Sequence, residues 1–280
     1  MLTPQLLGFA AFGLVPILQT MWLSLQQINP YTGDSRYVGI ANYRRFATDP
    51  GMPEVLRTTG IYVAGITVLG LSLALALAVL VNHRLPGIQV FRTIFFLPAL
   101  VTLAAWTLVW RFVLQPQGLL DQISGAVGLG SPDWLNTKGL ALASVIVLQV
   151  LKGVGINMVI LLAALQAVPT DLKEAAYVEG ASRRRIFWHV TLPSISPQVF
   201  MVGVLLLVGS FQVFEQILLL TGGGPGRSTT VLSYYVYQQA FQYSDQGYAS
   251  ALATILFLLI MLLTAIVWLS RRRLVFYESK

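Results

Sequence analysis

Strongly polar side chains interrupt two long apolar stretches of this chain, 140–168 and 197–220. In chain order they are Gln149, Lys152, Asn157, Gln212 and Glu215. Polar and ionisable groups inside a hydrocarbon layer are costly and usually mark a solute pathway, a proton relay or an ion pair. These residues predict either solute binding through hydrogen bonds or ion coupling through a carboxylate. The absence of cysteine excludes thiolate chemistry, and two histidines argue against a zinc site.

The spacing of residues on these two stretches predicts two helical faces. The first face holds Gln149, Lys152, Gly153 and Ile156, and the second holds Leu206, Gly209, Ser210 and Val213, each at i, i+3, i+4 and i+7. Gln212 and Glu215 follow as further pathway candidates. Small residues also allow close helix packing, so packing and cavity lining both stay open for the glycines. Lys152 is expected to face a cavity or to pair with Glu215, because exposure to lipid is too costly.

The composition identifies the environment that must position these residues. The chain has 280 residues, of which 56% are hydrophobic and 10% are charged, whereas soluble proteins carry about 25% charged residues. A membrane-spanning helix needs about 20 mostly apolar residues. Six stretches of a single membrane domain qualify: 4–25, 57–82, 91–114, 140–168, 197–220 and 249–270. A cleaved signal peptide is the alternative for the first stretch, but no small-residue cleavage site follows it.

Basic residues predict the orientation and account for the net charge of +7 without a nucleic-acid partner. With the N-terminus in the cytoplasm, the inner segments hold Arg84, Arg92, Lys173, Arg183, Arg184, Arg185, Arg271, Arg272, Arg273 and Lys280. The outer loops hold Arg36, Arg44, Arg45, Arg57, Lys138 and Arg227. The excess lies inside, and two arginine triplets adjoin the ends of apolar stretches. Both termini and the polar segment 169–193 are therefore expected in the cytoplasm.

The segment 169–193 is predicted to form two short helices that meet at a glycine. Asp171 is expected to cap the first helix in a capping box with Glu174. Gly180 suits a positive φ at the end of that helix, and Ser182 suits the cap of the second. Pro193 is expected to limit the second helix. Apolar residues are expected to stiffen the segment: Leu172, Ile186, Phe187 and Val190. This pattern is typical of a docking element.

The same segment resembles the EAA loop of ATP-binding-cassette (ABC) importer permeases. The matching residues are Glu174, Ala175, Ala176, Gly180, Leu192 and Pro193. The family usually has isoleucine where Val190 stands and often aspartate where Glu179 stands. Further motifs similar to the carbohydrate-uptake branch cover nearly the whole chain: Val38–Tyr43, Phe95–Pro98, Lys152–Gly155, Gly209–Phe211 and Thr221–Gly226.

The resemblance implies an all-α polytopic membrane protein with six transmembrane helices, the type I ABC importer permease fold. It implies that the six EAA-loop residues couple the chain to an ATPase and that the two polar faces line the cavity for a sugar or sugar-like solute. It further implies a second permease subunit, two copies of an ABC ATPase that bind ATP and Mg²⁺, an extracytoplasmic solute-binding protein, and a bacterial or archaeal plasma membrane. The side chains on the two faces differ from the maltodextrin type, which leaves oligosaccharides, disaccharides and glycerol phosphates open.

The glycine run 222–226 does not predict nucleotide binding. A P-loop needs the pattern GxxxxGK[ST] between a strand and a helix, and this run has neither the lysine nor that setting. We expect a tight turn at a helix end on the outer face, and no ATP hydrolysis by this chain. Two other functions stay open: a secondary transporter, which would need Glu215 for ion coupling, and a membrane scaffold, which would need no polar faces.

The sequence carries five smaller expectations. Pro98 is expected to kink the stretch 91–114. Tryptophans at span ends are usually interfacial, so Trp134 is expected at the headgroup level. For Trp106, Trp110 and Phe211, an interfacial position is favoured over stacking on a sugar. The residues 42–46 are expected to form a short interfacial helix, and Pro86 with Gly87 a turn.

Overall fold

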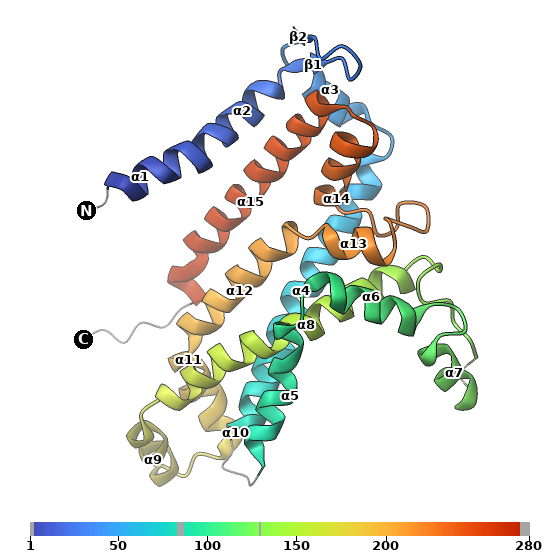
Figure 1. The fold of residues 1–280 in the computed structure, drawn as a ribbon. Coiled ribbons are helices and arrows are strands. Elements are labelled where there is room, and N and C mark those ends of the chain that lie inside the picture. Colours follow the sequence, from blue (N-terminus) through green and yellow to red (C-terminus); the bar gives the residue numbers. More distant parts are fainter. Residues whose placement is uncertain (1–2, 83–86, 129, 275–280) are drawn as a thin grey trace.

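The computed structural model describes residues 3–82, 87–128 and 130–274. Long helices run between two ends of an elongated molecule (Figure 1). The elements, where η denotes a five-residue π-helical turn, are α1 (Thr3–Phe9), η1 (Ala10–Leu14), α2 (Val15–Leu23), β1 (Gln26–Ile28), β2 (Ser35–Tyr37), α3 (Ala41–Thr48), α4 (Met52–Val81), α5 (Ile88–Leu100), α6 (Leu103–Leu114), α7 (Leu119–Ala126), α8 (Leu140–Ala167), α9 (Thr170–Val178), α10 (Arg183–Ile186), η2 (Phe187–Thr191), α11 (Leu192–Ser194), α12 (Ser196–Phe211), α13 (Glu215–Leu220), α14 (Leu232–Tyr237), η3 (Gln238–Gln242) and α15 (Gln246–Leu274).

Four helices in the described part of the chain are long and apolar enough to cross a membrane. They are Thr3–Leu23, Met52–Val81, Leu140–Ala167 and Gln246–Arg271. The number rises to six if each of two bent pairs counts as one span: α5 with α6–α7, bent by 102°, and α10–α11 with α12, bent by 67°. Arg84 and Lys280 lie outside the described residues. The predicted Pro86–Gly87 turn is described only at Gly87, which has a positive φ of 82°.

The helix predicted over 91–114 is wrong as a single helix. Pro98 lies inside α5, but the break comes after Leu100, where Val101 and Thr102 are extended. The Thr102 hydroxyl accepts a hydrogen bond from the Ala105 N–H at 3.4 Å and so starts α6. A proline disturbs the turn around it, whereas a threonine cap starts a new helix. The cap therefore decides where this stretch breaks.

The helix predicted over 197–220 is also interrupted. α12 ends at Phe211, and α13 begins only at Glu215. Gln212 and Phe214, which lie between them, have non-helical backbone angles. Val213 is therefore not on the helix that carries Gly209, and the second predicted face is incomplete.

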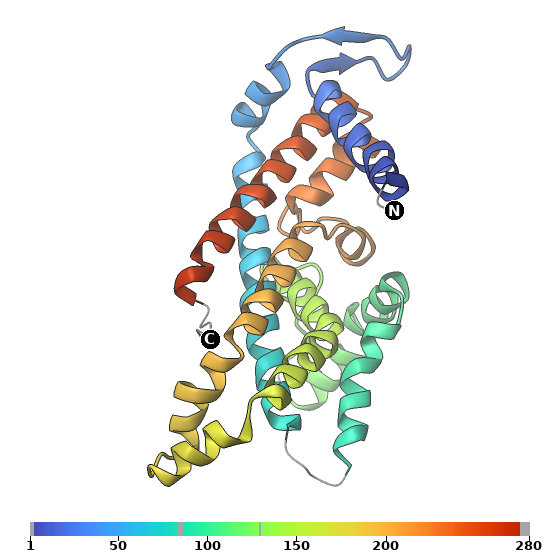
Figure 2. The same ribbon diagram turned by 90° about the vertical axis from the view of Figure 1, so that its left-hand side faces the viewer.

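The core lies where α4 crosses α8 and α12, and Figure 2 shows α4 passing behind α12. Small residues of α4, Ala74 and Ala78, are fully buried. They meet larger buried side chains of α8, such as Met158 and Leu161, in one apolar cluster. Alternation of small and large side chains allows two helices to approach closely without voids. The pairing of α4 with α8 is thus the scaffold on which the polar residues of α8 are mounted.

One glycine fixes the close approach of α5 to α8. A methyl group at Gly155 would lie 2.1 Å from the backbone oxygen of Phe95. Only glycine fits at this separation, so Gly155 serves packing. By contrast, a methyl at Gly153 would meet only the Asn157 amide at 3.8 Å, and one at Gly209 would meet nothing within 4 Å. Those two glycines face open space.

A short antiparallel hairpin and α3 form one end of the molecule, here called the hairpin end (Figure 1). Strand β1 pairs with β2 in the register Gln26 with Tyr37. Asn29 starts the turn because its side-chain oxygen accepts from two backbone N–H groups. The all-helical expectation did not include this hairpin. The helix expected at 42–46 is present within α3.

Asp49 ties the hairpin end to the last helix. Its carboxylate accepts hydrogen bonds from the hydroxyls of Tyr235 at 2.7 Å and Tyr248 at 3.0 Å. Burial alone would raise the pKa of Asp49, but the Tyr235 hydroxyl, the Gly51 N–H, the Tyr248 hydroxyl and the charge of Arg227 together lower it. Burial and the bond to Asp49 raise the pKa of Tyr235 to about 12. The carboxylate is thus held ionised by three donors.

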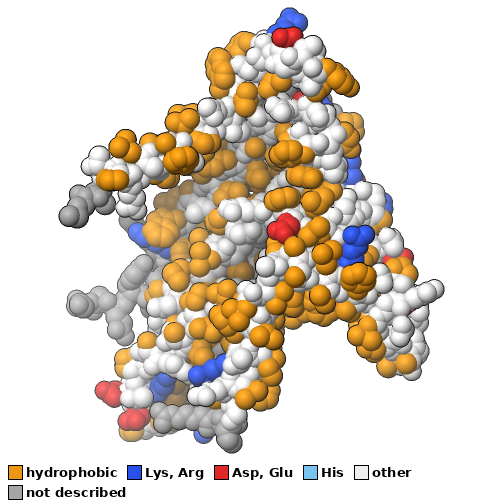
Figure 3. Space-filling view, in the orientation of Figure 1, with side chains coloured by type: hydrophobic (Ala, Val, Ile, Leu, Met, Phe, Trp, Pro, Cys, Tyr) orange, Lys and Arg blue, Asp and Glu red, His pale blue; other side chains and the backbone are white. Residues whose placement is uncertain are grey.

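The N-terminal helix stands apart from the body of the molecule. α1, η1 and α2 lean away from the other helices in Figures 1 and 2, and contact with the remaining helices runs through α2 and α15. None of the residues in its apolar window is buried. Figure 3 shows hydrophobic side chains spread along the whole visible face, with charged side chains at both ends and only a few at mid-height. This distribution fits a chain surrounded by lipid.

Candidate functional site

The segment 169–193 lies at the end of the molecule opposite the hairpin, which we call the α9 end (Figure 1). α9 ends in a turn at which Gly180 has a φ of 80°. The N–H of Ala181 donates to the Ala176 oxygen at 3.0 Å, and that of Gly180 donates to the Tyr177 oxygen at 3.0 Å. This is the bonding of a helix that ends on a left-handed residue. The predicted role of Gly180 in the bend is confirmed.

The second helix begins as predicted, since the Ser182 hydroxyl accepts from the Arg185 N–H at 3.4 Å. The predicted capping box of the first helix is wrong. α9 starts two residues earlier, with Pro169 at the cap position and no side-chain cap. Pro169 precedes α9 because its fixed φ suits a helix start and it has no N–H to satisfy. Asp171 instead lies in the first turn, where its charge favours the positive end of the helix dipole.

Pro193 does not end the second helix where the sequence predicted. The helical segment continues through the π turn η2 into α11 and reaches Ser194. In this turn the N–H of Leu192 donates to the Phe187 oxygen, five residues back. The wider turn leaves room for a proline ring that would clash in a regular α-helix. The bend of 67° comes at Ile195, where α12 begins.

The segment presents apolar side chains to its surroundings. Tyr177 is 50% exposed, Val178 is 89% exposed and Trp188 is 55% exposed. Leu172, which was expected to stiffen the segment, is 41% exposed, whereas Ile186 is buried. The three arginines 183–185 are also exposed. Clustered exposed apolar residues with a polar rim are typical of a protein-binding surface.

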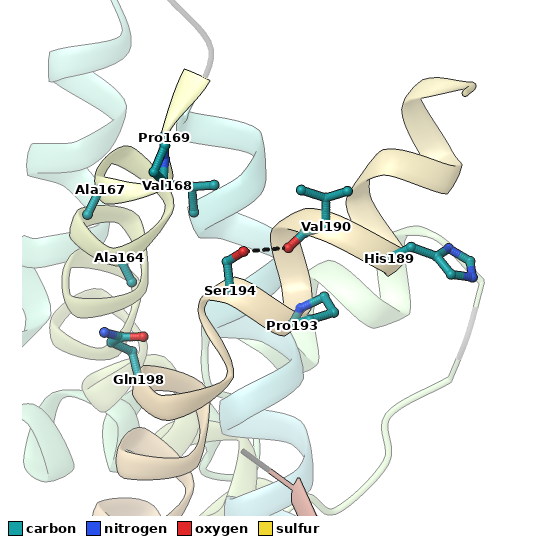
Figure 4. A pocket seen from close by; sticks show the side chains of 9 residues that line it. All are labelled: Ala164, Ala167, Val168, Pro169, His189, Val190, Pro193, Ser194 and Gln198. Carbon is teal, nitrogen blue, oxygen red and sulfur yellow. Dashed lines mark hydrogen bonds between the residues drawn. The ribbon is translucent and has the colours of Figure 1, made fainter. Parts of the chain in front are cut away.

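A cavity of about 560 Å³ separates the end of α8 from the turn that leads into α12 (Figure 4). Its walls come from Ala164, Ala167, Val168, Pro169, His189, Val190, Pro193, Ser194 and Gln198. The Ser194 hydroxyl donates to the Val190 oxygen at 2.7 Å, which closes this turn on itself. The segment is therefore not packed tightly against α8 and has room to move relative to it.

Lys152 reaches the broken helix and not a carboxylate. Its Nζ donates to the oxygens of Pro98 at 3.2 Å and Val101 at 2.6 Å. Among the described residues, one ion pair is formed, between Arg45 and Asp245. Lys152 and Glu215 therefore do not form the predicted ion pair. Lys152 thus supplies the hydrogen bonds that the break between α5 and α6 leaves open.

The structure separates the predicted pathway residues into two groups. Gly153 and Lys152 are partly exposed, Ile156 is 46% exposed, and Gly209 and Gln212 are exposed. Leu206 lies against Gly70 of α4, where an added methyl group would be 3.4 Å from the Leu206 side chain, and Ser210 and Val213 are buried. The side-chain oxygen of Gln149 is buried without a hydrogen-bond partner. Glu215 is partly exposed at the start of α13.

Sequence reasoning missed two polar residues near this site. Gln216 is fully buried, and neither atom of its amide has a hydrogen-bond partner. It stands beside Glu215 in an apolar stretch, a signal that was available. Arg111 lies in α6 and donates from Nη1 to the Leu219 oxygen at 3.0 Å. Its position inside the predicted span 91–114 was equally visible in the sequence.

Aromatic residues give mixed outcomes. Trp106 donates from Nε1 to the Leu148 oxygen at 3.2 Å and meets Trp110 edge-on, so this pair packs on α8. Phe211 is buried. Trp134 packs against the apolar core.

The Gly222–Gly226 run forms a turn after α13, in which the Gly222 N–H donates to the Ile217 oxygen at 2.8 Å, and the predicted turn at a helix end is confirmed.

Comparison with known proteins places this chain in a family. Residues 66–275 match the family described as binding-protein-dependent transport system inner membrane component. The chain is 33% identical over 268 residues to the probable ABC transporter permease protein YurN of Bacillus subtilis (strain 168), covering 94% of this chain and 91% of the relative. It is 34% identical over 277 residues to the sn-glycerol-3-phosphate transport system permease protein UgpA of Yersinia pestis, covering 98% and 94%.

Solved structures agree with the sequence relatives. The fold resembles a chain of a bacterial ABC transporter involved in import of the acidic polysaccharide alginate, with a TM-score of 0.85, 22% identity and coverage of 98% and 94%. A second structure, of a bacterial alginate ABC transporter in complex with an alginate pentasaccharide-bound periplasmic protein, gives a TM-score of 0.86 at 22% identity, with coverage of 98% and 93%. The predicted type I ABC importer permease fold is confirmed. The chain is a multi-pass membrane protein that belongs to the family of binding-protein-dependent transport system inner membrane components.

Proposed function

We propose that this chain is a permease subunit that forms part of the translocation pathway of an ATP-driven importer for a sugar or sugar-like solute. The single observation that carries this proposal is the exposed helical segment at the α9 end, within a chain of this family. The relatives named for glycerol phosphate and alginate transport support the solute class. Oligosaccharides, disaccharides and glycerol phosphates all fit this class.

The segment 169–193 couples this chain to a separate ABC ATPase, present in two copies, which binds ATP and Mg²⁺. Ala175 on exposed α9 has little side-chain bulk, so a partner surface can approach closely. Exposed Tyr177 and Val178 supply apolar contact area. Glu174, Ala176, Gly180, Leu192 and Pro193 complete the coupling element. The cavity behind the segment leaves room for it to shift when the ATPase subunits close.

The solute passes along the exposed parts of α8 and α12, facing a second permease subunit. Lys152, Gly153 and Ile156 on α8, with Gly209 and Gln212 near the end of α12, are accessible in the isolated chain. Gln149, Ser210 and Glu215 adjoin this surface as supporting pathway residues. Leu206 and Val213 do not line this surface but support it from the protein interior through packing. Glycines at the surface leave space for a bulky solute.

The α9 end and both termini face the cytoplasm, and the hairpin end faces outward in a bacterial or archaeal plasma membrane. Basic residues at the α9 end support this orientation. A solute-binding protein would dock at the hairpin end, as a solved neighbour was captured with a solute-bound periplasmic protein. The N-terminal helix, unburied and splayed, offers a surface to lipid or to the second permease subunit.

The test is purification of the tagged chain from its native host in mild detergent, followed by an ATPase assay. We expect an ABC ATPase and a second permease to co-purify, and hydrolysis to rise when the solute-loaded binding protein is added. A variant with Gly180 replaced by valine should keep the complex in the membrane but lose that stimulation. Solute movement by the lone chain under an ion gradient, without ATP, would contradict the proposal.

A further inference from the structure

A second cavity, of about 380 Å³, lies between the end of α6 and the loop that follows α13. Its polar lining includes Arg111, Gln115, Asn136 and Thr221, and the backbone of Gly222 and Gly224 forms another wall. Small-molecule sites typically enclose about 300–1,000 Å³. The cavity is separate from the pathway residues on α8 and from the cavity behind the α9–α11 segment.

Arg111 brings an uncompensated positive charge to this cavity. Its Nη1 donates to the Leu219 oxygen at 3.0 Å, which holds the guanidinium beside α13. In the described part of the chain Arg111 forms no ion pair. A guanidinium has five N–H donors in a planar fork that matches a carboxylate or a phosphate. The anchored side chain therefore has donors left for an anionic group.

Asn136 supplies a hydrogen-bond acceptor of fixed orientation in the same cavity. Its Nδ2 donates to both carboxylate oxygens of Asp133, at 3.0 and 3.1 Å. Its backbone N–H donates to the same side chain at 3.1 Å. Because the amide nitrogen is engaged, the amide oxygen is left as the free acceptor. A sugar hydroxyl can donate to such an oxygen, while an anionic group cannot.

We propose that this cavity is an outer subsite for an acidic carbohydrate, which rests on the importer function proposed above. The carboxylate or phosphate of the solute binds the Arg111 guanidinium, and a neighbouring hydroxyl donates to Asn136. With the orientation proposed above, the glycine loop belongs to the outer side of the protein, from which the binding protein would release solute. Lys138 lies against the same loop, with its Cε 3.8 Å from the position of a methyl at Gly226. It adds a second positive charge nearby.

The test uses the purified transporter complex in nanodiscs of phosphatidylcholine and measures binding of glucuronate and of glucose by calorimetry. We expect the wild-type complex to bind glucuronate at least tenfold more tightly than glucose. Arg111→Gln should abolish this preference. Arg111→Lys, which keeps the charge but lacks the fork, should retain part of it, and Asn136→Leu should weaken both sugars. Arg36→Gln removes the same charge from exposed strand β2 and should change nothing.

Equal binding of the two sugars by the wild-type complex, or an unchanged preference in Arg111→Gln, would overturn the subsite. Nanodiscs that contain phosphatidylglycerol test whether the anionic group that binds in the cavity is a lipid headgroup and not part of the solute. If that lipid eliminates glucuronate binding to the wild type but not the residual binding to Arg111→Gln, the cavity holds a lipid headgroup and the proposal fails. Stimulation of hydrolysis by the binding protein is measured on the same samples. Its presence without acidic preference refutes the subsite alone, and its absence in every sample refutes the importer function.

Discussion

Replacing Lys152 by methionine should destabilise the protein by about 2–3 kcal/mol. Methionine has a similar length, so the packing of α8 is kept while the two donors are lost. The ammonium bonds to the Pro98 oxygen at 3.2 Å and the Val101 oxygen at 2.6 Å. A hydrogen bond with one charged partner contributes about 1.5–3 kcal/mol. The longer bond lies at the lower end of that range, and release of a charge from a low-dielectric site offsets part of the loss.

The assay is unfolding of the purified chain in mixed micelles with increasing SDS, followed by circular dichroism. Lys173→Met is the matched control, since Lys173 lies on the exposed helix α9, and it should change the free energy of unfolding by less than about 0.5 kcal/mol. Glu215→Gln should also have little effect, because Lys152 bonds to carbonyls and not to that carboxylate. Unchanged stability in Lys152→Met would refute the role of the lysine at the helix break. An equal loss in Glu215→Gln would show that the pair with Glu215 is the stabilising interaction.

Three further predictions follow from backbone geometry and charge. Gly155→Ala should destabilise the same micelle preparation by about 1–3 kcal/mol, because its methyl would lie 2.1 Å from the Phe95 oxygen, whereas Gly209→Ala, with nothing within 4 Å, should be neutral. Gly180→Val forces a β-branched residue to a φ of 80° and should reduce solute uptake in vesicles severalfold while membrane insertion on an immunoblot stays unchanged; normal uptake would show that the turn at Gly180 is not needed for coupling to the ATPase. The pKa of Asp49 is lowered from 3.8, so its stabilising contribution is present above that value and is lost as the pH falls through the folded-state pKa. Acid unfolding should therefore show a loss of stability below about pH 4 that is absent in Asp49→Asn. Equal pH profiles for the two proteins would refute this role of Asp49.

The sequence could predict the local chemistry of the coupling segment because that chemistry depends on neighbours in the chain. Gly180 and Ser182 have the positions that the sequence predicted, since a positive φ and a serine cap are set by adjacent residues. The start of α9 was missed by two residues. A capping pattern at Asp171 and a proline at 169 both signal a helix start, and the proline prevailed. Such competition between two local signals cannot be resolved without the surrounding structure.

The partner of Lys152 could not be predicted because it depends on two breaks that come from distant parts of the chain. The sequence offered Glu215 as the partner, but α12 ends at Phe211, and α13 sets Glu215 on a separate axis. The break at Val101 meanwhile places open carbonyl groups beside α8. A lysine in a membrane takes the acceptors within reach. Hydropathy cannot show where such a break falls, because both halves of the stretch are equally apolar.

The connection from the coupling segment to the pathway is helical for nearly its whole length. From Arg183 to Phe211 the backbone leaves the helical form only at Ile195. Ile195 is 1% exposed, so this bend is held by packing and does not behave as a free loop. The π turn η2 carries the helix past Pro193, which would otherwise break the connection. We therefore expect a push on α9 to pass through the Gly180 turn into α10 and then through the fixed bend at Ile195 into α12, so that Gly209 and Gln212 near the far end of that helix move with it.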